Sequence, residues 1–422
     1  MALLAGGLKW RSTHVANAAP VEAKVASSVE IEDVQLRALG GKARAEAKEL
    51  PDLSRISVDD GTAVAPSIPS GRAIKLTVRP ELQRFANKLL ASHHLPEAAV
   101  VMTDVKTGHV IAYASHVENG RARDLCREAT APSASVFKII TASALLEKGV
   151  ADINTLECYP DGGESRITPF HLRVDPARDH YCSTLAQAMG KSTNPVFARL
   201  ASRHLQPSEL EQKARTLGYG TPLPFDVPLT SSDITIPTDA LGFARTAAGF
   251  WNSTLSPVHA AWLATTIARG GNAIDLHVVD GEPAEEHVVM AKDQADHVQD
   301  MLEHTVVEGT SRRAFHDGHG TPFLPGIRAV GKTGTLSDNE KNRFYTWFMG
   351  SATPEDAEKS PVAIAVLVVN RPTWKVKANV IAREMLRAYF AGEKLPHVTM
   401  PKIDRNASSA GSVAALKKPR AH

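Results

Sequence analysis

Ser135 and Lys138 form the single S-x-x-K pattern of the chain. On a helix, residues three apart share a face, so the lysine amine can reach the serine hydroxyl. A serine is a weak nucleophile until a base accepts its proton, and a neutral lysine can do so when burial or a neighbouring cation lowers its pKa. The pattern predicts a serine nucleophile with a lysine base. An exposed helix with an incidental Ser and Lys fits the same residues.

A second hydroxyl and a side-chain amide follow at Ser192 and Asn194. A hydroxyl near the first nucleophile could relay a proton, and the amide could hold a carbonyl or the lysine. The alternative is structural, because Pro195 disfavours the helical conformation in the residue before it and could simply end a helix.

A K-T-G-T pattern lies at Lys332, Thr333, Gly334 and Thr335, before an aromatic and apolar run. On an exposed strand edge, this backbone could pair with an extended peptide. Lys332 could bind a carboxylate and lower the pKa of Lys138, the threonines supply hydroxyls, and the glycine permits close approach. A glycine-rich turn between strands is the alternative.

Short motifs also arise by chance in this chain. A second K-T-G occurs at 106–108, inside a hairpin turn, and a second S-x-N occurs at 337–339, directly after the third motif. The functional interpretation therefore depends on the order of the three motifs and on the elements that carry them.

Those elements are expected from the spacing of apolar residues. We predict strands over 73–78, 98–104, 109–115, 346–351 and 361–370. We predict helices over 80–92, 135–149, 183–204, 257–269 and 379–390. Strands at both ends of this region with helices between them favour an α+β or mixed α/β layer architecture.

Composition limits the class of protein. The 422 residues include 48 Lys+Arg and 46 Asp+Glu, a net charge of +2, which argues against a nucleic-acid partner. No run of about 20 apolar residues predicts a membrane span. We expect residues 1–73 to be a largely disordered extension with a proline-rich linker at 61–72, and residues 396–422 to be a flexible basic tail. The paired His316 and His319 lack further ligands, so no metal or other cofactor is expected.

The three motifs, in this order and on these elements, resemble the transpeptidase domain of penicillin-binding proteins. The similarity extends over 74–395 and includes LTVRPELQRFANKLL, AAVVMTDVKTGHVIAYAS, SVFKIITASALLEKG and STLAQAMGKSTNPVFARLA. The resemblance implies an antiparallel sheet flanked by helices, with an all-helical subdomain. Ser133 and Ala134 stand where many members have Pro-Gly, and no glycosyltransferase domain is expected in the residues before the match.

The resemblance implies roles for the motif residues. Ser135 would attack the carbonyl of a D-Ala-D-Ala stem peptide, with Lys138 as its base. Ser192, with Lys332 close by, would pass a proton to the leaving amine. The backbone N–H groups of Ser135 and Thr335 would form the oxyanion hole.

The remaining motif residues would bind substrate. Asn194 would bind the substrate amide. Lys332, Thr333 and Thr335 would receive the carboxylate, with Gly334 allowing the strand to come close.

The same resemblance implies partners and a location. Stem peptides and β-lactams would bind, other cell-wall synthesis proteins would be partners, and the location would be the periplasm or the outer face of the cytoplasmic membrane. In such a compartment Cys158 and Cys182 could form a disulfide, and two unrelated buried thiols remain the alternative; Cys126 would stay unpaired. D,D-Carboxypeptidase, β-lactamase and slow penicillin-binding scaffold or sensor remain open as functions.

Overall fold

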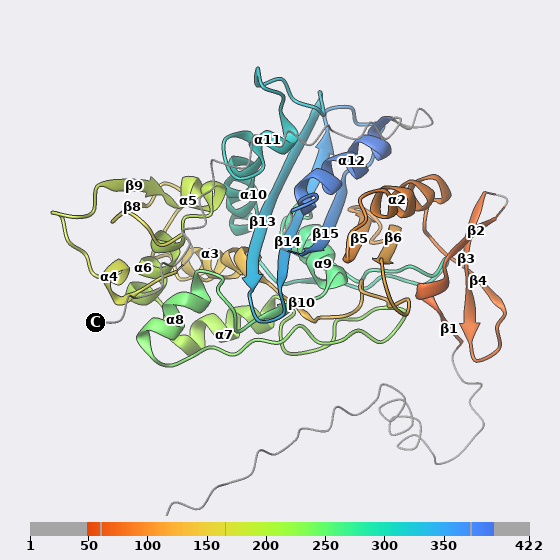
Figure 1. The fold of residues 1–422 in the computed structure, drawn as a ribbon, viewed down its shortest axis with the longest axis horizontal. Helices are drawn as coiled ribbons and strands as arrows, with labels where there is room; N and C mark the ends of the chain where they lie inside the picture. The colour runs from red at the N-terminus through yellow and green to blue at the C-terminus, as the bar shows by residue number, and fades with distance from the viewer. Residues whose placement is uncertain (1–48, 60, 165, 372–373, 392–422) are drawn as a thin grey trace, which may run out of the picture. The chain divides into compact units, whose positions relative to one another are not determined.

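The computed structural model describes residues 49–59, 61–164, 166–371 and 374–391. Its centre is a five-stranded antiparallel sheet in the order β13-β14-β15-β5-β6 (Figure 1). The strands are β5 (Glu97–Asp104), β6 (Val110–Val117), β13 (Ile327–Asp338), β14 (Arg343–Pro354) and β15 (Val362–Asn370). The predicted antiparallel sheet, built from strands at both ends of the region, is confirmed.

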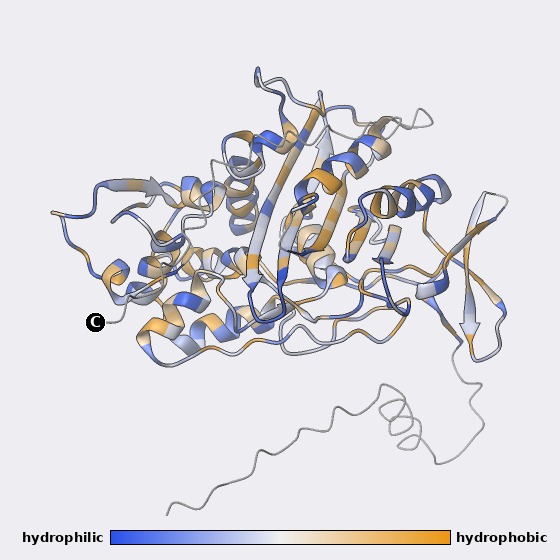
Figure 2. Cartoon of the chain, in the orientation of Figure 1, coloured by the Kyte–Doolittle hydropathy of each residue, from blue (hydrophilic) through white to orange (hydrophobic). Residues whose placement is uncertain are grey.

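β15 shows why this sheet lies inside the protein. All nine of its residues are buried, and Figure 2 shows it as a hydrophobic strand. Successive side chains of a strand point to opposite faces, so a strand covered on both sides reads as a continuous apolar run. Ala363, Ala365, Leu367 and Val369 join one core cluster, whereas Val362, Ile364, Val366 and Val368 join the other.

Helices cover both faces of the sheet. α9 (Pro257–Ala268) contributes to the first core cluster. α2 (Pro80–Ser92) and α12 (Ala378–Ala391) pack on the opposite face. These three helices lie close to the predicted ranges, because their apolar residues recur at helical spacing.

A helical region lies beside β13 and supplies the other motifs. Its helices are α3 (Lys138–Glu147), α4 (Pro169–Leu172), α5 (Leu185–Lys191), α6 (Asn194–His204), α7 (Pro207–Thr216) and α8 (Ala240–Ala247). α10 (Lys292–Val307) packs between this region and β13, followed by α11 (Arg312–Phe315). The predicted helical subdomain also carries a hairpin of β8 (Leu156–Tyr159) and β9 (Tyr181–Thr184).

The hairpin of β8 and β9 brings together the two cysteines whose pairing the sequence left open. Cys158 and Cys182 face each other in its register and form a disulfide. Cys126 is buried and unpaired. The bridge closes the segment 158–182 into a covalent loop.

The predicted linker over 61–72 is wrong. β3 (Thr62–Ile68) alternates partly buried and buried residues up to Ser67 and pairs with its neighbours in a small antiparallel sheet. The other strands of that sheet are β1 (Leu50–Pro51), β2 (Ser57–Asp59) and β4 (Ala73–Lys75). Small residues and prolines suggested a linker, but the alternation places Ala63 and Ala65 in the core. The disorder predicted for residues 1–73 is therefore wrong for the described positions 49–59 and 61–73, whereas residues 1–48 and 396–422 lie outside the described residues.

The single helix predicted over 183–204 is also wrong, because it is interrupted at the second motif. α5 ends at Lys191, Ser192 adopts a left-handed conformation (φ 59°), and α6 begins at Asn194. A left-handed residue cannot continue a helix, and Pro195 is accommodated in the first turn of the next one. Ser192 therefore projects from a corner and not from a helix face.

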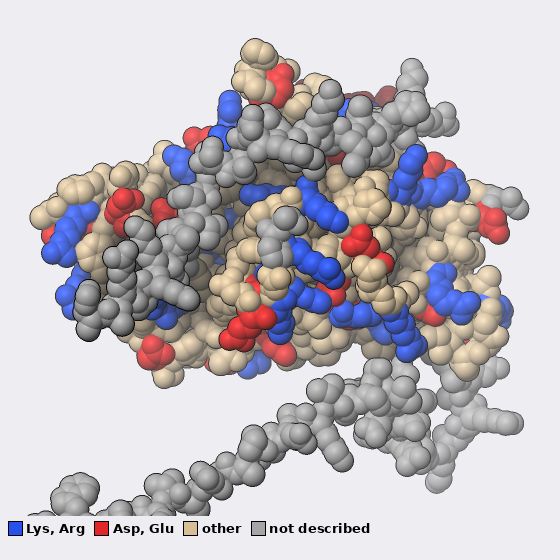
Figure 3. Space-filling view, in the orientation of Figure 1, with Lys and Arg blue, Asp and Glu red and all other residues tan. Residues whose placement is uncertain are grey.

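The surface carries charges of both signs, and several short elements complete the fold. Figure 3 shows basic and acidic side chains interspersed on one face, in keeping with the near-neutral charge. Among the described residues, no helix is both long and apolar enough to span a membrane. The short elements still to be named are β7 (Ala131–Pro132), η1 (Leu53–Arg55), η2 (Ala134–Phe137), β10 (Thr254–Leu255), β11 (Asn272–Ile274) and β12 (Glu286–Val288).

Candidate active site

Ser135 lies on a tight turn at the entrance of α3. The 3-10 segment η2 carries it, and Ala134 just before it has φ 49°. Gly249 passes directly behind this turn. A Cβ on Gly249 would lie 2.5 Å from the Ala134 carbonyl oxygen and 2.9 Å from the Ser135 Cα. Because Gly249 has no side chain, its backbone can pack directly against the backbone of Ala134 and Ser135.

Lys138 is fully buried, and its Nζ has three hydrogen-bond partners. These are the Ser135 Oγ at 2.8 Å, the Asn194 Oδ1 at 2.6 Å and the Ala248 carbonyl oxygen at 2.5 Å. The last two can only accept. A neutral amine has two N–H groups for these acceptors and one lone pair left for the proton of Ser135. The geometry thus suits a base that accepts the serine proton.

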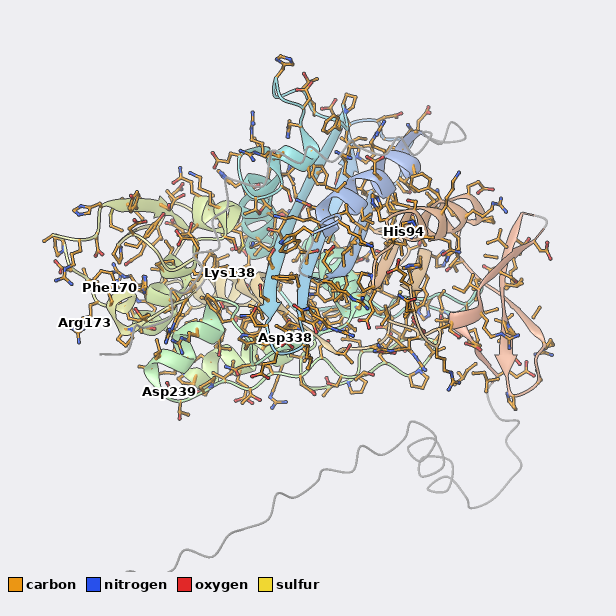
Figure 4. All side chains as sticks on the ribbon, in the orientation of Figure 1. His94, Lys138, Phe170, Arg173, Asp239 and Asp338 are labelled. Atoms are coloured by element: carbon orange, nitrogen blue, oxygen red, sulfur yellow. A yellow bond between two sulfur atoms is a disulfide. The ribbon has the colours of Figure 1, made fainter. Side chains whose placement is uncertain are left out.

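The electrostatics favour that neutral form. Burial, assisted by the positive charge of Lys332, lowers the pKa of Lys138 well below its usual value. Burial alone lowers the pKa of Lys332 to about 7. Lys332 donates to the Thr333 carbonyl oxygen at 2.8 Å. Figure 4 shows Lys138 between the helical region and β13.

Asn194 stands at the start of α6 and is almost fully buried. Its Nδ2 donates to the carbonyl oxygens of Gly163 (3.0 Å) and Glu164 (2.7 Å). These two acceptors determine which way the amide is turned, so Oδ1 faces Lys138. Asn194 was expected to bind a substrate amide; in this structure both of its polar atoms are engaged within the protein.

A cleft of about 540 Å³ opens above Ser135. The motif residues that line it are Ser135, Ser192, Asn194, Thr333, Gly334 and Thr335. Lys138 and Lys332 lie buried beneath its surface. The structure therefore brings together all eight residues singled out from the sequence, from three separate segments.

β13 forms one wall of this cleft and is one of the two edge strands of the central sheet. A Cβ on Gly334 would lie 3.2 Å from the Ala134 Cβ, so a larger residue would press the strand away from the nucleophile turn. Behind the strand, the indole of Trp347 donates to the Pro132 carbonyl oxygen at 2.8 Å. These contacts hold the strand against the turn that carries Ser135.

Three further groups at the active site were not predicted from the sequence. The hydroxyls of Thr310 and Thr333 are 2.5 Å apart, and Thr310 lines the cleft. Thr310 follows a glycine in the V-V-E-G-T segment, a signal that could have been used. Glu164 also lines the cleft, and the Ala248 carbonyl contacts Lys138. Both lie in segments whose placement depends on tertiary packing, so no spacing rule could identify them.

The competing motifs lie elsewhere. Residues 106–108 form the turn between β5 and β6, and residues 337–339 follow at the end of β13; neither group lines the cleft. Within the described part of the chain, no group of three or more His, Cys, Asp or Glu residues is arranged to hold a metal ion.

Known proteins share this sequence pattern. The family model described as "Penicillin binding protein transpeptidase domain" matches residues 98–387. Stage V sporulation protein D of Bacillus subtilis is 23% identical over 368 residues, which cover 79% of this chain and 54% of that protein. Peptidoglycan D,D-transpeptidase PbpA of Mycobacterium tuberculosis H37Rv is 27% identical over 285 residues, covering 63% and 56%. The chain thus spans about half the length of these curated relatives.

Solved structures share the fold. PBPA from Mycobacterium tuberculosis matches with a TM-score of 0.61 at 20% identity, covering 75% of this chain and 82% of that one. The D,D-transpeptidase domain of a peptidoglycan glycosyltransferase from Eggerthella lenta matches with a TM-score of 0.60 at 23% identity, covering 74% and 82%. An imipenem acyl-enzyme complex of the Mycobacterium tuberculosis protein matches equally well, with a TM-score of 0.61 at 20% identity over 76% and 80%.

Proposed function

Because the chain belongs to the penicillin-binding protein transpeptidase family, we propose that it is a peptidoglycan D,D-transpeptidase acting through an acyl-enzyme at Ser135. The observation that carries this proposal is the buried Lys138 amine, held 2.8 Å from the Ser135 hydroxyl between two fixed acceptors. A serine activated in this way is a nucleophile for acyl transfer.

Acylation would begin with attack of the Ser135 oxygen on the carbonyl between the two D-alanines. Lys138 takes the serine proton, and the backbone N–H groups of Ser135 and Thr335 stabilise the oxyanion. As the C–N bond breaks, the leaving amine of D-alanine receives a proton through Ser192, which lines the cleft beside Asn194. The products are an ester on Ser135 and free D-alanine.

Substrate would bind along β13. An extended peptide can add to the free edge of this strand by main-chain hydrogen bonds. The terminal carboxylate would meet the hydroxyls of Thr333 and Thr335, with Lys332 supplying positive charge from below. An amine of a second stem peptide then attacks the ester and releases Ser135. β-Lactams would acylate the same serine, because their strained amide resembles the acyl donor.

Release by water is a second candidate, favoured by one observation. Glu164 lines the same cleft, on the loop that contacts Asn194. A carboxylate there could activate water against the ester, which would make the chain a D,D-carboxypeptidase or a β-lactamase. The proposal for the whole protein also includes other cell-wall synthesis proteins as partners, and a site of action in the periplasm or at the outer face of the cytoplasmic membrane.

Intact mass measured over time after addition of benzylpenicillin tests the proposal. A lasting adduct of one drug per chain, absent from Ser135→Ala, supports a transpeptidase with slow deacylation. Destruction of the drug without an accumulating adduct indicates hydrolysis, and Glu164→Gln should then make the adduct persist. Intact drug and no adduct would rule out the acyl-enzyme mechanism.

A further inference from the structure

We propose that the disulfide-closed loop 158–182 positions Asn194, and through it Lys138, and that Arg199 is the residue that holds this loop in place. This inference rests on the proposed acyl-transfer function. Figure 4 shows Phe170 and Arg173 of the loop at the outer side of the helical region, away from Lys138. Of the described residues of the loop, Tyr159, Gly162 and Glu164 line the active-site cleft, and the Gly163 carbonyl oxygen accepts from Asn194.

Arg199 projects from α6, and its side chain is completely buried. A guanidinium has five N–H donors, and all five are used here. Nε donates to the His171 carbonyl oxygen (2.6 Å), and Nη1 and Nη2 donate to the carbonyl oxygens of Cys158 (2.6 Å) and Arg173. The remaining two N–H groups meet the Asp179 carboxylate at 2.7 and 2.9 Å. All these acceptors belong to the loop.

Burying the charge of an arginine costs free energy unless its N–H groups are all paired, so Arg199 requires the loop to keep these acceptors in place. The acceptors come from the beginning, the middle and the end of the loop. Arg199 therefore ties distant parts of the loop to one point on α6. The disulfide closes the loop at its base, and Arg245 adds a hydrogen bond to the Ile167 carbonyl oxygen at 2.9 Å.

The inner segment of the loop is pressed against the start of α6. Gly163 has φ 88°, and a Cβ there would lie 2.7 Å from Pro195 Cγ. This close approach places the carbonyls of Gly163 and Glu164 on the Asn194 Nδ2. An amide has its two N–H donors on one side and its oxygen on the other. Holding Nδ2 on the loop therefore aims Oδ1 at Lys138.

Loosening the loop would remove that constraint. Asn194 could rotate, and water could reach the Lys138 amine from the cleft. The charged side chains around Lys138 are Lys332 on β13 and, at the rim of the cleft, Glu164, Lys191 and Lys377. Hydration would favour protonation of Lys138 and would disturb its contact with Ser135. The chemical step of acylation would slow, whereas the carboxylate site on β13 would remain intact.

The test compares Arg199→Met with Arg343→Met. Arg343 also makes a two-pronged pair with a carboxylate, Glu97, at 3.0 and 3.1 Å, but it lies outside the cleft. Stopped-flow acylation by benzylpenicillin gives the limiting acylation rate and the dissociation constant of the initial complex, measured from pH 5 to 9. Thermal unfolding verifies that each variant is folded.

For Arg199→Met we expect the limiting rate at pH 7 to fall by about tenfold or more, with the dissociation constant changed less than about threefold. The ascending limb of the pH profile should move to higher pH by about one unit. Arg343→Met should match the native chain. A folded Arg199→Met variant with an unchanged limiting acylation rate would overturn the inference. So would a variant in which the limiting rate and the dissociation constant both change while the ascending limb of the pH profile stays in place.

A second variant keeps the test decisive if Arg199→Met does not fold. The double substitution Cys158→Ala/Cys182→Ala opens the loop but leaves the arginine in place, and Cys126→Ala controls for the loss of a cysteine. The double variant should show the same pattern, weaker in size, and no change would again refute the inference. If the native chain is not acylated at all, the proposed function fails first.

Discussion

Removal of the Lys332 charge should change how acylation depends on pH. Lys332 is buried beneath the threonines of β13, and burial lowers its pKa to about 7. Lys138 has a lowered pKa for the same reason and also because Lys332 is close. Productive reaction with a ligand that carries a carboxylate needs Lys332 charged and Lys138 neutral. The second-order acylation constant should therefore rise and then fall with pH.

The falling limb has a predictable size. With a pKa of about 7, Lys332 is about nine-tenths charged at pH 6 and about one-tenth charged at pH 8. The acylation constant for benzylpenicillin should drop about tenfold across this interval, since the profile of this constant reports the free enzyme. In Lys332→Met the constant should be low, and the falling limb near pH 7 should be absent.

Rapid mixing at constant ionic strength, with intact mass as the readout, measures these constants. The methyl ester of benzylpenicillin is the matched ligand, because it keeps the β-lactam and lacks the carboxylate. We expect the ester to react slowly in the native chain and to show no falling limb. An ester with the same limb as the free acid would refute the assignment of Lys332 to carboxylate binding.

Three further predictions concern positioning and stability. Gly249→Ala should lower the acylation constant about 100-fold by displacing Ser135, whereas Gly281→Ala, at a similar positive φ with open space around it, should not. Lys332→Met should raise the free energy of unfolding by up to about 5 kcal/mol at pH 6 and by about 2 kcal/mol at pH 9. The gain is larger at pH 6 because the pKa of the lysine is about 7 in the native chain and about 10.5 in the unfolded chain, so the buried charge destabilises the native state most at low pH. Equal gains at both pH values in denaturant titrations would contradict this. Trp347→Phe should cost about 1–3 kcal/mol by leaving a buried carbonyl unpaired, as thermal unfolding would show.

Much of the sheet and several helices follow from local patterns. The apolar run of β15 and the helical spacing of α2, α9 and α12 are readable in the chain, because burial on one or two faces selects apolar residues at fixed intervals. Local patterns were misleading where two signals conflicted. The prolines and small residues of β3 hid its alternation, and the apolar spacing around Ser192 hid a break between two helices.

The sequence by itself determined which residue types could carry acyl transfer and in what order, because the hydroxyls, amines and glycines of the three motifs are set by identity and spacing. The protonation states and orientations of these side chains were decided by the tertiary structure alone. The pKa values of Lys138 and Lys332 depend on burial, and the orientation of Asn194 depends on loop carbonyls 30 and 31 positions away. Desolvation and long-range hydrogen bonds arise only when distant segments pack together, so no reading of neighbouring residues could supply them.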